Sequence, residues 1–246
     1  MGVREDRALY SSMSLARYLA RLGYGSRTAC EQLLRQRRVT TATGEPLRDD
    51  ARADHETIRV DGHPLDPPPG AVILLHKPVG YVCSLQDRPP LVYEHLPPRF
   101  PLRRPVNAPV GRLDADTSGL LLLTDDGALN HRLTSPRAHL PKTYRVTLAE
   151  PLRGDEAPIF ACGGLMLRGE TTPLQPATMR AVDDQTAEIT IFEGRYHQLR
   201  RMFAAVGNHV TALHRLQLGP LALGHLPVAT WRILDPNEVA SLAAPP

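Results

Sequence analysis

The chain has little cysteine and almost no lysine. Its three cysteines, Cys30, Cys83 and Cys162, are far apart in the sequence and form no CxxC pair. This excludes a disulfide framework and the usual zinc-binding spacing, and it favours a reducing compartment. We therefore expect a cytoplasmic protein without a bound metal. Only two of the 29 basic residues are lysines, Lys77 and Lys142, so arginine carries almost all of the positive charge.

Long apolar runs are also missing. No stretch of the 246 residues approaches the length of a membrane span, so no membrane partner is expected. The first twelve residues mix two arginines with two acids and lack the apolar core of a signal peptide. We interpret residues 1–12 as a disordered tail, and the sequence leaves open whether translation begins at Met1 or Met13.

Positive charge is concentrated in two segments. The net charge of +3 excludes a general polycation, but residues 17–38 hold six arginines and one acid. Residues 195–215 hold four arginines, three histidines and no acid. Such clusters are typical of phosphate-binding surfaces, although an ordinary solvated face gives the same pattern.

Two aspartates, Asp114 and Asp116, lie in a short polar segment directly before an apolar run. The run Leu120–Leu123 ends at the turn formers Asp125-Asp126-Gly127, which predicts a short buried strand. A buried strand holds the side chains of an attached polar segment in place, as catalytic groups require. The alternative is a turn whose aspartates only cap backbone amides.

The first part of the chain predicts a compact module of two helices and a small sheet. Residues 14–22 have apolar side chains at helical spacing, and a second helix is expected to begin near Ser26 or Thr28. Residues 39–43 and 57–60 are expected strands. The consecutive prolines of residues 67–70 then form a stiff linker.

The second part of the chain alternates strands with short helices. Residues 142–148 alternate, with Tyr144 on the apolar side, and predict a half-buried strand. Residues 197–206 predict a helix. The proline-rich residues 87–109 are an irregular stretch of the kind that lies at binding surfaces. Further strands are expected at residues 71–75, 188–192, 210–213, 221–223 and 230–234, and a short helix at 128–133.

Three separated blocks resemble the pseudouridine synthases of the ribosomal small-subunit/large-subunit family. Gly111–Leu120 resembles the catalytic motif of that family, Lys142–Tyr144 its tyrosine motif and Glu193–Phe203 its third motif. Three motifs in the expected order are far more specific than any one of them. The resemblance implies an enzyme that isomerises uridine to pseudouridine in ribosomal RNA.

The first module resembles the S4 RNA-binding domain. The matching residues include Leu15, Leu19 and the turn Val60-Asp61-Gly62. Two positions depart from that pattern, because Ser14 replaces a basic residue and Thr43-Gly44 replaces an Asn/Asp-Gly turn. The resemblance implies that arginines of this module contact an RNA backbone.

Together the resemblances imply an α+β protein: a small N-terminal S4-like domain followed by a catalytic domain on a mixed, largely antiparallel sheet with flanking helices. The expected boundaries are 13–66 for the S4-like domain, 67–70 for the linker, 71–236 for the catalytic domain and 237–246 for a C-terminal tail. The expected RNA-binding residues are Arg17, Arg21, Arg27, Arg35, Arg37, Arg38, Arg200 and Arg201.

Pseudouridine formation detaches uracil from C1′, rotates it and rejoins it through C5. No redox change or group donor is involved, so no cofactor is required. By the resemblance Asp114 is the nucleophile, and it attacks either the sugar or the base. Tyr144 assists proton removal from C5. Arg195 is the cation that keeps the Asp114 carboxylate ionised in a largely dry pocket.

The remaining site assignments also follow the family motifs. Arg112 is expected to contact the substrate backbone, and Leu199 to form an apolar wall of the pocket. His197 and Gln198 are expected to bind substrate and orient the turn before the helix. Asp116 is interpreted as structural, capping amides of the Thr117–Gly119 turn.

Within the family, the match is to the branch that modifies uridine 516 of 16S rRNA, on the evidence of residues 77–84, 134–137 and 202–210. The expected partner is 16S rRNA, free or in a partly assembled small subunit, and the expected enzyme is a monomer. Three alternatives stay open: 23S rRNA as the target, a non-catalytic assembly factor, and a nucleoside or glycoside hydrolase that uses Asp114 and Asp116 as an acid/base pair.

Overall fold

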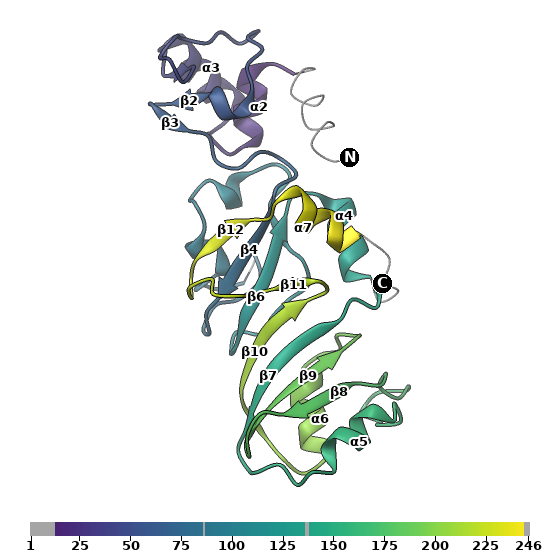
Figure 1. The fold of residues 1–246 in the computed structure, drawn as a ribbon. Helices are drawn as coiled ribbons and strands as arrows, with labels where there is room; N and C mark the ends of the chain where they lie inside the picture. The colour runs from purple at the N-terminus through teal and green to yellow at the C-terminus, as the bar shows by residue number, and fades with distance from the viewer. Residues whose placement is uncertain (1–12, 86, 136–137, 244–246) are drawn as a thin grey trace.

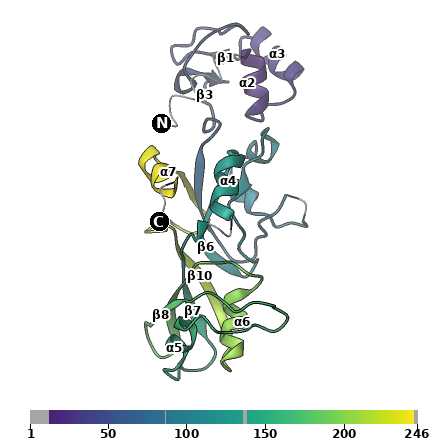
Figure 2. The ribbon, with the colours of Figure 1, turned by 90° about the vertical axis from the view of Figure 1, so that its right-hand side faces the viewer.

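The computed structural model describes residues 13–85, 87–135 and 138–243, which form a small helical unit followed by a long twisted sheet (Figure 1). The molecule is elongated, with the N-terminal unit at one end (Figures 1 and 2). The predicted tail at residues 1–12 lies outside the described residues.

The N-terminal unit has its own hydrophobic core, formed by residues between Leu15 and Val60. Helices α2 (Leu15–Arg21) and α3 (Arg27–Arg35) share this core with the antiparallel strands β1 (Val39–Thr40), β2 (Arg59–Val60) and β3 (His63–Pro64). A 3₁₀ turn, η1 (His55–Thr57), precedes β2. Ser26 caps α3, because its Oγ accepts a hydrogen bond of 3.1 Å from the Ala29 amide. Both predicted helices are therefore present.

The main sheet has the strand order β12-β4-β6-β10-β7-β9-β8. Among the strand pairs of the described residues, β6 and β10 are parallel and the others antiparallel, which confirms a mixed sheet. The short strands β5 and β11 pair with β6 and β10. The bounds are β4 (Val72–Lys77), β5 (Ala108–Pro109), β6 (Thr117–Thr124), β7 (Lys142–Leu148), β8 (Thr178–Ala181), β9 (Thr186–Ile191), β10 (Val210–Leu218), β11 (Leu221–Ala222) and β12 (Trp231–Ile233).

Helices cover both faces of this sheet (Figures 1 and 2). Side chains of α5 (Glu156–Ala161) and α6 (Gln198–Ala205) share a core with Leu121 and Leu123 of β6. Side chains of α4 (Gly127–Thr134) and α7 (Pro236–Ala243) share a second core with Leu120 and Leu122. Successive strand residues face opposite sides, so a strand buried on both faces needs an unbroken apolar run. This explains the four consecutive leucines.

Several elements were not expected, among them the short strands β3 and β5, helix α5 and strand β8. Helix α5 and strand β8 lie in a stretch for which the sequence predicted no structure, and residues 236–243 form the helix α7, where the sequence predicted a tail with a helical turn or a frayed end. Leu242 of α7 is only 4% exposed, and Arg232 forms an ion pair of 2.6 Å with Glu238. The C-terminal segment therefore packs as part of the fold up to residue 243. None of the described helices is long and apolar enough to cross a membrane.

The N-terminal unit is docked onto the proline-rich stretch that follows β4, which contains the 3₁₀ turns η2 (Val92–His95) and η3 (Phe100–Leu102). The Arg104 amide donates a hydrogen bond of 2.9 Å to the Arg21 carbonyl, and Arg99 forms an ion pair of 2.6 Å with Asp66. The Gly70 amide also donates to a carboxylate oxygen of Asp125 at 2.7 Å. The linker is therefore pinned at its ends by specific contacts.

Candidate active site

Asp114 lies in the loop between β5 and β6. The Thr117 amide donates to the Asp114 carbonyl at 3.1 Å, and the Gly80 amide donates to the Ala115 carbonyl at 2.6 Å. The adjoining Leu113 is buried in the main core, whereas the Asp114 side chain is 41% exposed. The loop backbone is thus fixed while its carboxylate is open to solvent.

A buried lysine fixes the backbone of this loop by hydrogen bonds. Lys77, at the end of β4, is 0% exposed. Its ammonium group donates hydrogen bonds to the carbonyls of Asp114 (3.1 Å), Ala115 (3.3 Å) and Thr117 (2.7 Å), and to its neighbour Pro78 (3.0 Å). Burial lowers the pKa of Lys77, whereas the negative charges nearby, including those of Asp114 and Asp116, oppose that shift. From the sequence, Lys77 was only part of the stretch 77–84 that matches the 16S rRNA branch, and no role was assigned to it.

The side chain beside the Asp114 carboxylate is His197. Its Nε2 lies 3.6 Å from an Asp114 carboxylate oxygen. His197 precedes α6 in a left-handed conformation, with φ 48° and ψ 35°. This uncommon backbone conformation turns the chain sharply at the start of the helix. The turn therefore presents an imidazole to the loop that carries Asp114.

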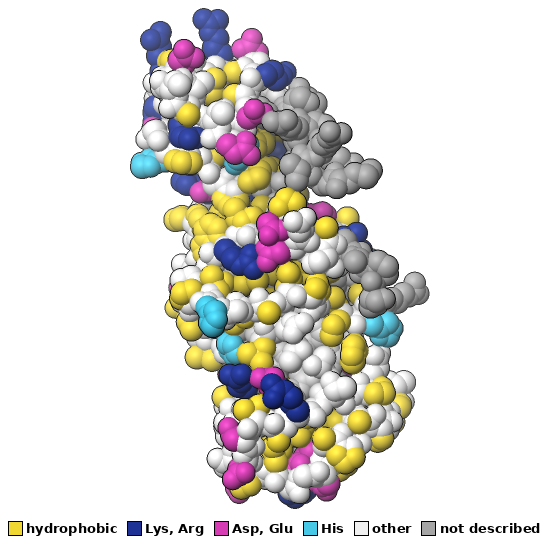
Figure 3. All heavy atoms as spheres, viewed as in Figure 1, with side chains coloured by type: hydrophobic (Ala, Val, Ile, Leu, Met, Phe, Trp, Pro, Cys, Tyr) yellow, Lys and Arg dark blue, Asp and Glu magenta, His cyan; other side chains and the backbone are white. Residues whose placement is uncertain are grey.

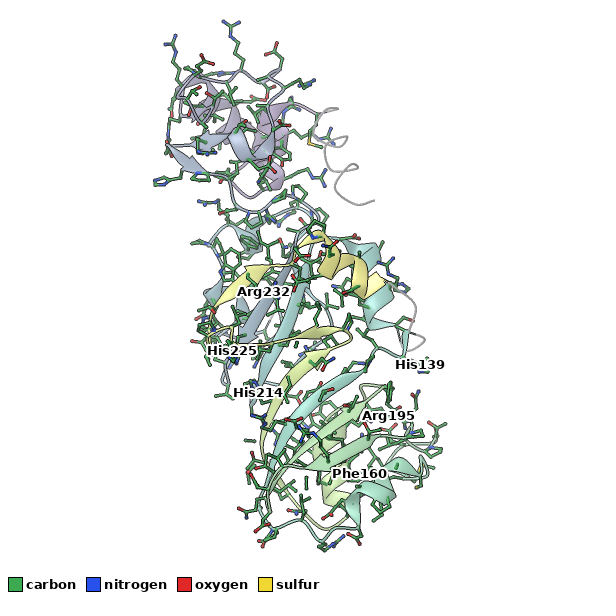
Figure 4. The ribbon with its side chains drawn as sticks, in the orientation of Figure 1. His139, Phe160, Arg195, His214, His225 and Arg232 are labelled. Carbon is green, nitrogen blue, oxygen red and sulfur yellow. The ribbon has the colours of Figure 1, made fainter. Side chains whose placement is uncertain are left out.

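Arg195 does not occupy the place beside Asp114 that the sequence predicted. Its guanidinium group forms ion pairs with Glu193 (3.0 Å) and Glu170 (3.2 Å). It also donates to the carbonyls of Thr172 (2.8 Å) and Pro173 (2.6 Å). Figure 4 shows Arg195 beyond the end of β9, in the same lower part of the molecule as Phe160. The physical reason is that two acids surround this turn and attract the guanidinium.

Asp116 also differs from its expected role. Its carboxylate is 66% exposed and forms an ion pair of 2.8 Å with Arg200 of α6, instead of the expected caps to the next turn. Arg200 also donates to the Val210 carbonyl at 3.1 Å, and Arg201 forms an ion pair of 2.8 Å with Glu170. Both arginines were expected to bind RNA. In this structure they join α6 to the loops around it.

Two of the predicted pocket residues form part of the sheet core. Tyr144 of β7 is 7% exposed and Leu199 of α6 is 3% exposed. Arg215 of β10 pairs in register with Tyr144 and is 2% exposed. Its Nε donates to the Leu120 carbonyl at 2.7 Å, whereas its buried Nη2 has no hydrogen-bond partner among the described residues. Arg215 was recognised only as a member of a basic cluster.

The two remaining predicted residues lie at opposite extremes of exposure. Gln198 is buried and supports the turn, because its Oε1 accepts from the Arg195 amide at 2.9 Å and its Nε2 donates to Glu193 at 3.1 Å. The Arg112 side chain is 72% exposed, and its guanidinium lies 4.0 Å from Asp87. Arg112 is therefore available at the surface near the Asp114 loop.

The mixed sheet carries a fixed loop with an accessible carboxylate, and a buried tyrosine lies on the same sheet. This fold and site are those of an enzyme of the following class. The chain belongs to the RNA pseudouridylate synthase family, which it matches over residues 71–205. That range contains Asp114, Tyr144, Arg195 and the turn before α6.

Individual relatives match almost the whole chain. Ribosomal small subunit pseudouridine synthase A of Pasteurella multocida is 41% identical over 235 residues, covering 93% of this chain and 99% of the relative. The protein of the same name from Yersinia pestis is 42% identical over 240 residues, covering 95% and 99%. A solved structure described as a crystal structure of pseudouridylate synthase is 38% identical, with a TM-score of 0.66 and coverage of 94% and 99%.

Proposed function

We propose that this pseudouridine synthase modifies a uridine of 16S rRNA, which by the family resemblance is uridine 516. The support is the similarity over nearly full length to enzymes named for the small ribosomal subunit. We further propose that the enzyme works as a monomer in the cytoplasm, on 16S rRNA that is free or part of a partly assembled subunit.

The proposed nucleophile is Asp114. The observation that carries this proposal is an accessible carboxylate on a loop whose carbonyls are bonded to the buried Lys77. A nucleophile acts efficiently when its position is fixed before the substrate arrives. Because the uridine ring is stacked in RNA, the base has to be extruded before Asp114 reaches the sugar or the base.

The roles of the other site residues are proposed from their positions in the family motifs and from their contacts in the structure. Tyr144 is proposed to face the extruded base and to assist proton removal from C5, and Leu199 to form the apolar wall behind it. Arg195 remains a proposed catalytic residue by motif position. Its ion pairs with Glu170 and Glu193 support a role in fixing the turn that carries His197. The exposed Arg112 is proposed to contact a phosphate near the target.

The N-terminal unit is proposed to be an S4-like RNA-binding domain. Arginine side chains stand out on this end of the molecule (Figure 3). Arg17, Arg35 and Arg37 are exposed, whereas the exposed Arg27 and Arg38 form ion pairs with Glu31 and Asp61. Arg21 is only partly exposed and donates to the Arg104 carbonyl at 3.2 Å. The first three arginines are therefore the best placed to bind RNA.

Asp114→Asn tests the nucleophile. The amide has nearly the shape of the carboxylate, and Lys77 bonds the loop through main-chain carbonyls. We therefore expect pseudouridine formation to disappear while the Kd for RNA stays nearly unchanged. Asp116→Asn is the matched control, since it removes an equal charge from the same loop and is expected to keep turnover. Pseudouridine formed by purified Asp114→Asn enzyme would refute the assignment.

The RNA target is tested by mapping pseudouridines in both rRNAs of a deletion strain. Loss of one pseudouridine from 16S rRNA, restored by the wild-type gene, is the expected result. Loss from 23S rRNA instead would redirect the enzyme to the large subunit. Release of free uracil by the purified protein would favour a hydrolase, although Asp116, its required partner, is engaged with Arg200.

A further inference from the structure

Tyr196 is the most exposed large hydrophobic side chain among the described residues, at 76%. It lies directly before His197, and the two rings stack with centroids 3.9 Å apart and planes 17° apart. Single exposed apolar side chains are normal at protein surfaces. What distinguishes Tyr196 is its stacking on the very imidazole that lies 3.6 Å from the Asp114 carboxylate.

The backbone at this position is held on several sides. The Tyr196 carbonyl accepts a hydrogen bond of 3.1 Å from Arg201, which is itself paired with Glu170. The preceding residue is Arg195, whose guanidinium is anchored by two acids and two carbonyls. The exposed ring is therefore presented by a fixed turn. A ring held in this way loses little conformational entropy when a partner stacks on it.

One face of the Tyr196 ring is covered by His197, so the exposure belongs to the rest of the ring. An aromatic face open to water is the surface that nucleic acid bases stack on, whatever their sequence. One exposed arginine is close to this turn, because Arg201 donates to the carbonyls of both Tyr196 (3.1 Å) and Arg168 (2.7 Å), and the Arg168 side chain is exposed.

We propose that Tyr196 is the stacking platform for a nucleobase that flanks the target uridine in the substrate RNA. Because His197 stacks on one face of Tyr196, a base on the other face is separated by the whole tyrosine ring from the imidazole that lies 3.6 Å from Asp114, and we assign that base as a neighbour of the target. This inference rests on the proposed function, since it needs an RNA substrate at Asp114. Tyr196 is thereby a binding residue that sets how the strand enters the site.

The experiment uses the full-length enzyme and a 16S rRNA fragment that contains the target uridine. In two versions of the fragment, 2-aminopurine replaces the nucleotide before or after that uridine, and stacking on an aromatic ring quenches its fluorescence. We expect the wild-type enzyme and Tyr196→Phe to quench one of the two probes. Tyr196→Ala is expected to lose that quenching and to bind the RNA ~5- to 150-fold more weakly, from the usual contribution of base–aromatic stacking.

Val228→Ala is the matched control, because Val228 is also an exposed apolar side chain, at 58%. It is expected to quench and bind as the wild type does. Pseudouridine formation is measured on the same enzymes with the unlabelled fragment. Since the ring acts in binding, Tyr196→Ala is expected to raise KM and to leave kcat at saturating RNA nearly unchanged.

Equal quenching and equal Kd for Tyr196→Ala and the wild type would overturn the inference. A lower kcat with unchanged quenching would also overturn it, because the ring would then act only through His197. Failure of the proposed function is distinguishable, since it appears as a wild-type enzyme that forms no pseudouridine in this RNA. Quenching that depends on Tyr196 would support stacking in that case too.

Discussion

Replacing Lys77 with methionine tests whether the buried ammonium group fixes the Asp114 loop. Methionine has a similar length and no charge, so it fills the space and removes the hydrogen bonds. Three of those bonds reach carbonyls of the loop, at Asp114, Ala115 and Thr117. We expect the loop to shift and both stability and turnover to fall.

The size of the effect can be estimated from the contacts. A hydrogen bond to a charged group contributes ~1.5–3 kcal/mol, so the four lost bonds, including the one to the Pro78 carbonyl, remove ~6–12 kcal/mol. Part of this is recovered, because burying an ammonium group costs several kcal/mol and methionine has no such cost. We therefore expect the free energy of unfolding to fall by ~2–4 kcal/mol. A displacement of about 1 Å at Asp114 would lower kcat by ~100-fold.

Urea unfolding gives the stability change, and kcat is measured from pseudouridine formed at saturating RNA. Lys142→Met is the matched control, since Lys142 is the other lysine of the chain and its Nζ donates to one carbonyl, that of Leu140, at 2.9 Å. Its loss of stability and of kcat is expected to be smaller. A Lys77→Met enzyme with wild-type kcat would refute the reasoning, because the loop would then hold its position without the ammonium group.

Three further perturbations probe charge elsewhere in the molecule. The first replaces Arg17, Arg35 and Arg37, the exposed arginines of the N-terminal unit named above, with alanine. The slope of log K for RNA against log salt is expected to fall by ~2–3, and an unchanged slope would exclude their contact with phosphates. Burial lowers the pKa of His214, with smaller contributions in the same direction from His76 and Arg145. The unfolded chain therefore binds more protons just below the ordinary histidine pKa, and stability rises with pH through that window. His214→Gln is expected to flatten this rise in urea midpoints, and a rise of wild-type size would contradict the assignment. Hydrogen bonds, first from Arg201 and then from Arg195, hold the pKa of Glu170 below its usual value. The stability that Glu170 contributes is therefore present above the ordinary glutamate pKa and is lost as the pH falls through the lowered pKa. Glu170→Gln is expected to weaken that acid-side loss and to lower kcat by loosening the turn before α6; unchanged kcat would separate this turn from catalysis.

Local patterns predicted much of the fold. The alternation of residues 142–148 gave the bounds of β7, and Ser26 is the cap of α3. Asp126 caps α4 immediately after the leucine strand, through a hydrogen bond of 2.9 Å from the Leu129 amide. Helix α5 and strand β8 were not predicted, because the stretch between β7 and β9 contains several prolines and glycines that interrupt any periodic pattern.

The site was predicted less completely, because its contacts join distant parts of the chain. The motif block identified Asp114 as the candidate nucleophile, and alternation placed Tyr144 on the buried side of its strand, at 7% exposure. Neither pattern shows which residues a charged side chain contacts in the fold. The sequence placed Arg195 beside Asp114, whereas in the structure it pairs with Glu193 and with Glu170, which lies 25 residues before it in a stretch without a recognisable motif. The role of Lys77 was missed because a lysine that follows a predicted strand is usually exposed, and the sequence does not show that it is buried.

The parallel pairing of β6 with β10 has a consequence for the order of events during synthesis. Leu120 and Arg215, which are joined across this pair by a hydrogen bond, are 95 residues apart in the chain. At ~5–20 residues per second, the ribosome needs ~5–20 s to make the residues between them. Throughout that time β6 lacks a neighbour on one side and exposes the unpaired amides and carbonyls of that edge, and closing so long a loop is slow. The nascent chain therefore carries Asp114 well before the sheet around it can close, and the enzyme that modifies RNA of the ribosome is completed only after Arg215 has been added.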